Sequence, residues 1–288
     1  MSDKAHIKAN TGDAPELNTP TKRIKTAIAL LANEGFSGFI EALINKIFIS
    51  YFRFSSIKRF TLKTLHQEKN DVIKPLVNGV SYVYGMGVKG DIAEFGTMTG
   101  QTAVALAVAI NQLNSVYRLD SRGIKKGFFF DSFEGLPEAR FEVDRQSEHV
   151  ASGIWAKGTC RGLDEITFKK LISKYLSPDF FTVYKGWFKD TVPLLNNNQQ
   201  FALVHIDGDL YESAIDVLDL LFQRGQVSRG AMILFDDWNC NSAEPTLGER
   251  RAFSEVCKKY DIHYSDAGSY GIASHKFIIH QYSALIKA

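Results

Sequence analysis

Residues 91–110 read DIAEFGTMTGQTAVALAVAI. The run DIAEF predicts a buried strand, and TAVALAVAI predicts an apolar helix after a turn that carries Gly96 and Gly100. Glycines permit a tight turn and a close approach of the backbone to a ligand, while the amides at the start of the helix point toward that ligand. The stretch therefore predicts an α/β fold with a ligand-binding turn, although a turn with only a structural role is the alternative.

More apolar runs follow along the chain, and helical patterns separate them. The runs are GFFF (127–130), FTVYKG (181–186), FALVHID (201–207) and AMILF (231–235). Alternating strands and helices are typical of a parallel sheet with helices on both faces, so we predict a Rossmann-like, doubly wound and mostly parallel sheet. The segments HYSDAG (263–268) and KFIIH (276–280), which follow a helical pattern over residues 248–260, predict a closing pair of strands.

The sequence predicts a polar arm (1–25) and a helical segment (26–85) ahead of the main domain (86–288). The arm lacks the apolar run of a secretory signal. Between residues 26 and 59 the helical segment is rich in Ile, Leu and Phe but carries charged residues throughout, which excludes a membrane-spanning helix and indicates two amphipathic helices. We expect their apolar faces to pack on the main domain, to join a second subunit in a homodimer or larger homo-oligomer, or to contact a membrane surface. A further helix over residues 70–85 completes the segment.

Composition indicates a folded protein with a small-molecule partner. Lysine plus arginine (34) exceed aspartate plus glutamate (32) by only 34 − 32 = 2 among 288 residues, so the net charge gives no reason to expect a nucleic-acid partner. The three cysteines, Cys160, Cys240 and Cys257, are odd in number and lack metal-ligand spacing, so neither a disulfide framework nor a zinc site is predicted. We expect a cytoplasmic protein.

An acidic residue at the end of the second strand predicts a site for a ribose. In open α/β sheets, ligands bind beyond the carboxyl ends of the strands, where a carboxylate can accept hydrogen bonds from ribose hydroxyls. Asp131 ends the run GFFF, whereas Asp120, at the more usual spacing from the glycines, follows no clean apolar run. The turn also lacks the spacing G-x-G-x-x-G, which argues against the alternative of a nicotinamide-dependent oxidoreductase.

Three further aspartates predict a metal site. Asp207 and the pair Asp236 and Asp237 end two successive predicted strands. Carboxylates crowded at one edge of a sheet repel each other unless a cation neutralises them, and oxygen ligands favour Mg²⁺ or Mn²⁺ over zinc. The alternative is that one aspartate caps a helix and another binds the cofactor or a backbone amide. Asp209 is predicted to have only a capping role, as the N-cap of the helix that follows it.

Five sequence blocks occur together and in order. They are EFGTMTG (94–100), DSFEGLP (131–137), GWFKDTVP (186–193), HIDGDLYES (205–213) and FDDW (235–238). Together they resemble the macrocin O-methyltransferase family, which includes enzymes that methylate sugars of macrolide and aminocoumarin antibiotics. The resemblance covers residues 90–277, and it implies a class I methyltransferase fold.

The resemblance implies S-adenosylmethionine as the cofactor. It places Glu94, Gly96, Thr97 and Gly100 near the amino-acid and sulfonium end, Asp131 and Ser132 at the ribose, and Gly186, Trp187 and Phe188 near the adenine. It also implies a magnesium site formed by Asp207, Asp236 and Asp237, with Asp207 next to the cofactor and acting as the base. Serving as ligand and base together is a demanding double role. His205 is a competing base, or else a buried histidine with a satisfied hydrogen bond.

The polar stretch at 138–160 is long for a simple connection, so we expect it to form a lid or an acceptor-binding loop. Arg145, His149 and Trp155 are expected to contact the acceptor. Trp238, which follows the aspartate pair, is expected either to line the acceptor pocket or to fill the core.

The sequence therefore predicts an S-adenosylmethionine-dependent, Mg-assisted O-methyltransferase that acts on a hydroxyl of a sugar in a natural product or a surface glycan. A cation would position the acceptor hydroxyl and ease the loss of its proton, while the sulfonium already activates the methyl group. The alternatives are the nicotinamide-dependent oxidoreductase and a noncatalytic, methyltransferase-like module that docks on partners or membranes through its amino-terminal helices.

Overall fold

The structure is a computed structural model that describes residues 68–117 and 123–286. These residues belong to a compact unit that begins at Gln67. The predicted arm, the amphipathic helices at 26–59 and the alternative ribose ligand Asp120 lie outside the described residues. None of the helices in the described part of the chain combines the length and the apolar character that crossing a lipid bilayer requires.

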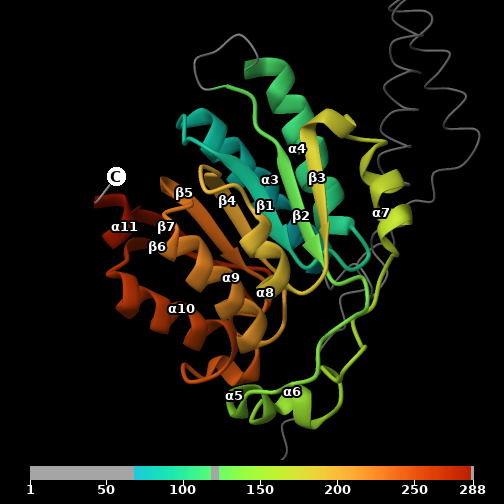
Figure 1. Ribbon diagram of the computed structural model, residues 1–288, viewed down its shortest axis with the longest axis vertical. Helices are drawn as coiled ribbons and strands as arrows, with labels where there is room; N and C mark the ends of the chain where they lie inside the picture. Colours follow the sequence, from blue (N-terminus) through green and yellow to red (C-terminus); the bar gives the residue numbers. More distant parts are fainter. Residues whose placement is uncertain (1–67, 118–122, 287–288) are drawn as a thin grey trace, which may run out of the picture. The chain divides into compact units, whose positions relative to one another are not determined.

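A seven-stranded sheet forms the centre of this unit, in the order β3-β2-β1-β4-β5-β7-β6 (Figure 1). The strands are β1 (Asp91–Phe95), β2 (Gly127–Asp131), β3 (Phe181–Lys185), β4 (Phe201–Ile206), β5 (Val227–Phe235), β6 (His263–Tyr270) and β7 (Ser274–Gln281). Strands β1 to β5 are parallel, and β7 pairs antiparallel with β5 and β6. The Rossmann-like sheet and its closing pair of strands are thus confirmed. The strand order reverses beside β1, and open sheets bind ligands at such a switch point.

Helices cover both faces of the sheet (Figure 1). They are α3 (Glu68–Gly85), α4 (Gln101–Tyr117), α5 (Glu142–Arg145), α6 (Glu148–Ala151), α7 (Glu165–Ile172), α8 (Phe188–Thr191), α9 (Tyr211–Gln223), α10 (Gly248–Tyr260) and α11 (Ser283–Ile286), with short 3-10 turns at Pro178–Phe180, Val192–Leu194 and Asn241–Ala243. Side chains alternate along β1, so Ile92 packs with α3, α4 and α7, while Ala93 and Phe95 pack with α9 and α10. Both faces of β1, β2 and β4 are buried, which explains their continuous apolar sequences, whereas the edge strand β3 is partly exposed.

The connection between β2 and α7 is the predicted long insertion, and its only helices are the short α5 and α6. A small apolar cluster holds it in place, in which Leu136 and Trp155 pack on Leu210 beside α9, with Val150 and Cys240 at the edge. This cluster is separate from the two large clusters that flank the sheet. The insertion therefore has a small core of its own beside the start of α9.

The turn after β1 lies directly against the backbone that follows β4. Gly96 has a φ of 95°, a left-handed conformation that favours glycine. A Cβ atom at this position would collide with the carbonyl oxygen of Asp207. The amide of Asp207 in turn donates a hydrogen bond of 2.8 Å to the carbonyl of Phe95. The glycine turn and the end of the aspartate strand are thus in main-chain contact.

Replacing Gly96 with alanine should therefore destabilise the fold. The left-handed conformation costs a residue with a Cβ about 1–2 kcal/mol, and the collision with Asp207 adds an overpacking cost of about 1–3 kcal/mol. Gly153 is the matched control, since its φ of 81° is similar and a Cβ there would meet nothing within 4 Å. Chemical denaturation should show a larger loss of unfolding free energy for Gly96→Ala than for Gly153→Ala. Equal losses would contradict the close packing of the turn.

Candidate functional site

A cavity of about 540 Å³ lies at the carboxyl ends of the parallel strands. Most residues predicted for the site line it, namely Gly96, Asp131, Ser132, Gly186, Trp187, Phe188, Asp207, Asp236 and Asp237. Glu94, Thr97 and Gly100 do not line it. The insertion contributes Glu138, Arg140, Lys157 and Cys160 to the wall. One cavity therefore joins the glycine turn, the end of β2 and the aspartates after β4 and β5.

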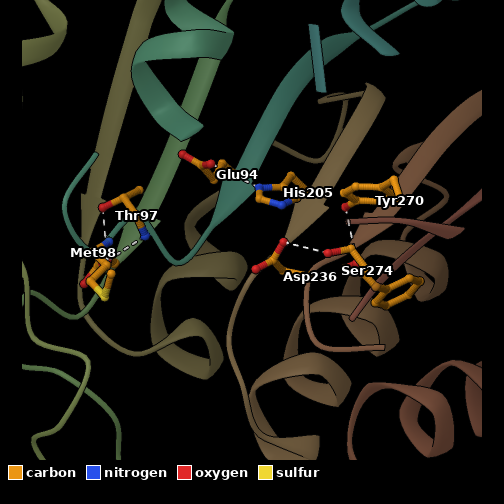
Figure 2. A network of polar contacts seen from close by, with 9 residues as sticks. Glu94, Thr97, Met98, His205, Asp236, Tyr270 and Ser274 are labelled. Carbon is orange, nitrogen blue, oxygen red and sulfur yellow. Dashed lines mark hydrogen bonds and ion pairs between the residues drawn. The ribbon is translucent and has the colours of Figure 1, made fainter. Parts of the chain in front are cut away.

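Asp131 holds the glycine turn in place. Its Oδ2 accepts hydrogen bonds from the amides of Thr97 (2.7 Å) and Met98 (3.0 Å) and from Thr97 Oγ1 (3.0 Å). Figure 2 shows Thr97 and Met98 in the turn after β1. Asp131 Oδ1 accepts one hydrogen bond of 2.6 Å, from the amide of Phe133. A carboxylate oxygen has two lone pairs, so Oδ1 keeps room for a further donor such as a ribose hydroxyl. Thr97 is buried and supports Asp131 from behind the cavity wall.

Glu94 and His205 form a buried pair between β1 and β4 (Figure 2). The two residues are partners in the strand register, and both are fully buried. His205 Nδ1 lies 3.1 Å from Glu94 Oε1, while Glu94 Oε2 and His205 Nε2 have no hydrogen-bond partner among the described residues. His205 does not line the cavity. It is therefore a buried histidine that bonds through one ring nitrogen, which leaves it out of contact with an acceptor.

Carboxylates crowd the cavity wall beyond β4 and β5. Asp207, Asp209, Asp236 and Asp237 all line it. Burial raises the pKa of Asp207 well above its usual range, and the charges of Asp236 and Asp237 raise this pKa further. Burial and the charges of Asp209 and Asp236 likewise raise the pKa of Asp237 well above its ordinary value. In their ionised forms these side chains therefore repel one another.

Asp209 is not the N-cap of α9, so the role predicted for it was wrong. Leu210 is the N-cap residue, and the first amides of α9 bond to Asp144 of the insertion instead. Asp209 has a φ of 60° and lines the cavity with no hydrogen-bond partner in the described part of the chain. Burial and the charge of Asp236 raise the pKa of Asp209 to about 7. Asp209 thus belongs to the acidic cluster.

Asp144 ties the insertion to α9. Its side chain is buried, its Oδ1 accepts the amide of Tyr211 at 2.7 Å, and its Oδ2 accepts the amide of Glu212 at 3.1 Å. Burial raises the pKa of Asp144 to about 6. The carboxylate satisfies amides that the helix itself leaves without acceptors. No local pattern signals this contact, because Asp144 and Tyr211 are 67 residues apart in the sequence.

Arg145, His149 and Trp155, which were expected to contact an acceptor, do not line the cavity. Arg145 donates to the carbonyl of Arg140 within the insertion. The His149 ring stacks on Trp155 with a centroid distance of 4.4 Å, and its Nδ1 lies 3.3 Å from Asn241 Oδ1. These side chains hold the insertion together and fasten it to the segment after β5. Arg140 is one of the insertion residues that reach the cavity wall in their place.

Trp238 fills the core, which is one of the two roles expected for it. Its ring packs on Phe235, Phe253 and Phe277 at centroid distances of 5.0, 5.8 and 4.9 Å. The side chain is 9% exposed and does not line the cavity. It therefore anchors the chain directly after the aspartate pair.

Two residues that sequence reasoning missed hold the aspartate pair. Ser274 Oγ donates a hydrogen bond of 3.0 Å to Asp236 Oδ1 (Figure 2). Glu249 Oε2 accepts the amide of Asp237 at 3.0 Å. Ser274 begins β7 and Glu249 lies in the first turn of α10. Both come near the site because β7 lies next to β5 in the sheet and α10 covers it, which no local pattern reveals.

The acidic cluster has the charge and the donors of a site for a hard divalent cation. Asp237 Oδ2 is buried and has no hydrogen-bond partner in the part of the chain that the structure describes. No ion pair within the described residues involves any of the four aspartates. Carboxylate oxygens suit Mg²⁺ and Mn²⁺. Within residues 68–117 and 123–286, however, no three His, Cys, Asp or Glu side chains are arranged as a ready ligand set. The charge and the donors fit such a cation, while the ligand geometry is not preformed.

The doubly wound sheet, with its cavity at the switch point, is the fold of a Rossmann-like class I methyltransferase. A sequence model described as "Macrocin-O-methyltransferase (TylF)" matches residues 69–259. The chain therefore belongs to this family, as its sequence blocks predicted.

Curated relatives carry the same kind of name. The chain is 29% identical over 177 residues to the 8-demethyl-8-(2,3-dimethoxy-alpha-L-rhamnosyl)-tetracenomycin-C 4'-O-methyltransferase of Streptomyces olivaceus, a match that covers 60% of this chain and 62% of the relative. It is 26% identical over 185 residues to the demethyldecarbamoylnovobiocin O-methyltransferase of Streptomyces niveus, with 64% of each chain covered. The match thus spans less than two thirds of either relative.

Solved structures share the fold. The O-methyltransferase NovP superposes with a TM-score of 0.59 at 22% identity, covering 73% of this chain and 80% of NovP. The calicheamicin methyltransferase CalS11 superposes with a TM-score of 0.56 at 20% identity, covering 96% of this chain and 99% of CalS11. At these identities the superpositions establish the fold.

Replacing Asp144 with alanine should loosen the insertion. The change leaves two amides of α9 without their acceptor, and the loss of an N-cap carboxylate costs about 0.5–2 kcal/mol. Trypsin should then cleave after Arg145 or Lys157 faster than in the wild type, because the insertion opens more often. Asp164→Ala is the control, since Asp164 caps α7 locally through the amide of Thr167. Cleavage that rises equally in both variants, or in neither, would contradict the anchoring role of Asp144.

Proposed function

We propose that this protein is an S-adenosylmethionine-dependent O-methyltransferase that methylates a hydroxyl of a sugar, in a natural product or in a surface glycan. The observation that carries the proposal is the single cavity that joins the glycine turn and Asp131 to the carboxylates after β4 and β5. A methyl donor on the first wall would lie beside an acceptor on the second. The curated relatives support this activity, since one is named as a 4'-O-methyltransferase of a rhamnosyl tetracenomycin.

The cofactor would bind along the wall formed by the β1 turn, the end of β2 and residues 186–188. Asp131 Oδ1 would accept a ribose hydroxyl, with Ser132 beside it, and Gly96 would let the backbone approach the amino-acid end. Residues 186–188 would flank the adenine. Glu94, Thr97 and Gly100, which do not line the cavity, would support the turn from behind without touching the cofactor.

Asp207, Asp236 and Asp237 would hold a divalent cation, Mg²⁺ or Mn²⁺. Such a cation, when bound, polarises an acceptor hydroxyl and eases the loss of its proton. Ser274 keeps Asp236 oriented through its hydrogen bond to Oδ1. Asp237 offers its buried and unpartnered Oδ2 as an oxygen ligand.

Asp209 is the residue we propose as the base, in place of Asp207. A ligand cannot readily serve as base as well, and Asp209 lines the same cavity without a hydrogen-bond partner among the described residues. It would take the proton of the acceptor hydroxyl while the oxygen forms its bond to the sulfonium methyl and S-adenosylhomocysteine leaves. Arg140 and the other insertion residues on the wall would position the acceptor.

Other expectations from the sequence stay predictions. They are the cytoplasmic location, the absence of a nucleic-acid partner, the homodimer or larger homo-oligomer, and the membrane contact through residues 26–59. The last two depend on residues outside the described part of the chain.

Calorimetric titration separates the proposal from its alternatives. We expect the protein to bind S-adenosylhomocysteine and not NAD, and to transfer a methyl group from S-adenosylmethionine to a rhamnosyl glycoside. EDTA should abolish the transfer, and Mg²⁺ or Mn²⁺ should restore it. Binding of NAD alone would support an oxidoreductase. Binding of neither ligand would support a noncatalytic module.

Asp209→Asn tests the base. We expect kcat to fall by about 10²–10⁴-fold, the contribution of a positioned general base, while the affinity for S-adenosylhomocysteine stays unchanged. Asp190→Asn is the matched control, because Asp190 is exposed on α8 and does not line the cavity. Steady-state kinetics with an acceptor that the wild type methylates provide the measurement. A kcat close to that of the wild type would show that Asp209 is not the base and would favour Asp207 as the base.

A further inference from the structure

Glu249 is a buried carboxylate at the edge of the acidic cluster. It lies in the first turn of α10, where an acidic side chain ordinarily remains in solvent and favours the helix dipole. Here the side chain is only 1% exposed. The helix dipole alone therefore does not account for a glutamate at this place.

Within the described residues, only one of its two oxygens has a partner. Glu249 Oε2 accepts the amide of Asp237, whereas Oε1 is buried with no hydrogen-bond partner there. Asp237 Oδ2 is buried and unpartnered in the same way. Two adjoining residues, linked by a hydrogen bond, thus each present a free carboxylate oxygen. Buried charged groups normally pair with an opposite charge or coordinate a metal.

Arg140, Lys157 and Lys189 line the same cavity, and the charge of His149 lowers the pKa of Asp237, but none of these side chains forms an ion pair with Glu249 within the described residues. None of the ion pairs in this part of the chain includes the aspartates of the cluster. Holding the amide of Asp237 does not require a charge either, because the neutral amide oxygen of a glutamine would accept the same hydrogen bond. A buried carboxyl at this position, in place of a neutral amide, therefore needs a reason other than that hydrogen bond.

We propose that Glu249 is a fourth carboxylate of the divalent-cation site. It is a positioning residue that fixes Asp237 through the main chain and adds the charge that strengthens binding of Mg²⁺ or Mn²⁺. The inference rests on the proposed cation site at Asp207, Asp236 and Asp237. It adds a residue that none of the five sequence blocks contains.

If Glu249 has this role, its replacement should stabilise the metal-free protein and weaken the binding of the cation. Glu249→Gln keeps an acceptor for the amide of Asp237 and replaces the buried ionisable carboxyl with a neutral amide. Without a cation, the variant no longer buries this carboxyl beside the aspartates, so it should unfold at a higher temperature than the wild type. With a cation, the affinity should fall by about 10–100-fold, as is usual for residues that support metal ligands. A residue with only a packing role would not change the two states in opposite directions.

The experiment uses the full chain after EDTA treatment and dialysis. Calorimetry with Mn²⁺ gives the affinity, and thermal unfolding with and without Mg²⁺ gives the stability of each state. Glu244→Gln is the matched control, since Glu244 is exposed just before α10 and its side chain accepts hydrogen bonds from Thr246. Asp237→Asn is the reference for a lost ligand. We expect weaker Mn²⁺ binding and a higher metal-free unfolding temperature for Glu249→Gln, and neither change for Glu244→Gln.

The outcomes distinguish the two proposals. Wild-type affinity in Glu249→Gln, together with lost affinity in Asp237→Asn, would overturn the role of Glu249 and leave the cation site in place. Wild-type affinity in both variants, or no binding by the wild type, would overturn the cation site and the role of Glu249 with it. Titration with S-adenosylhomocysteine should give the same affinity in all variants, which shows that the cofactor wall is intact.

Discussion

The main-chain contact between Gly96 and Asp207 is the constraint on which the site depends. Strands β1 and β4 are neighbours where the strand order reverses, and only a glycine fits against the carbonyl of Asp207. Asp131 holds the same turn from the side of β2. A ligand bound at the turn therefore lies next to the aspartates that follow β4 and β5, because the backbone itself connects the two walls of the cavity.

Burial is what raises the pKa values of the aspartates that follow β4 and β5. Every residue of β4 is buried, so the chain enters the cavity from an apolar interior in which an ionised carboxylate is poorly solvated. Burial is accordingly the first cause of the raised pKa of Asp207, Asp209 and Asp237, and the mutual repulsion comes second. The sheet thus holds several like charges close together at a cost in stability. Natural proteins accept such local conflicts chiefly at functional sites.

Sequence reasoning predicted the strands and the residues at their ends. Apolar runs locate the buried parallel strands, and Asp131 and Asp207 are recognisable because they directly follow such runs. The contacts of Asp144, Ser274 and Glu249 could not be predicted, since each bonds to a segment distant in the sequence or set by the sheet order. Local rules also misassigned Asp209, because a distant carboxylate satisfies the amides that a capping residue would normally serve.

Asp144 accepts the amides of α9 that Asp209 was predicted to cap, and this connects the insertion to the acidic cluster. Because Asp144 saturates the first amides of α9, Asp209 is free of structural duties and can face the cavity. The same insertion brings Arg140 to the cavity wall. Residues on its cavity face can therefore change, provided that Asp144 and the small core around Trp155 are kept. Under the proposed function, the cavity face of the insertion would select the acceptor, while Asp144 leaves Asp209, which precedes α9, free to act as the base.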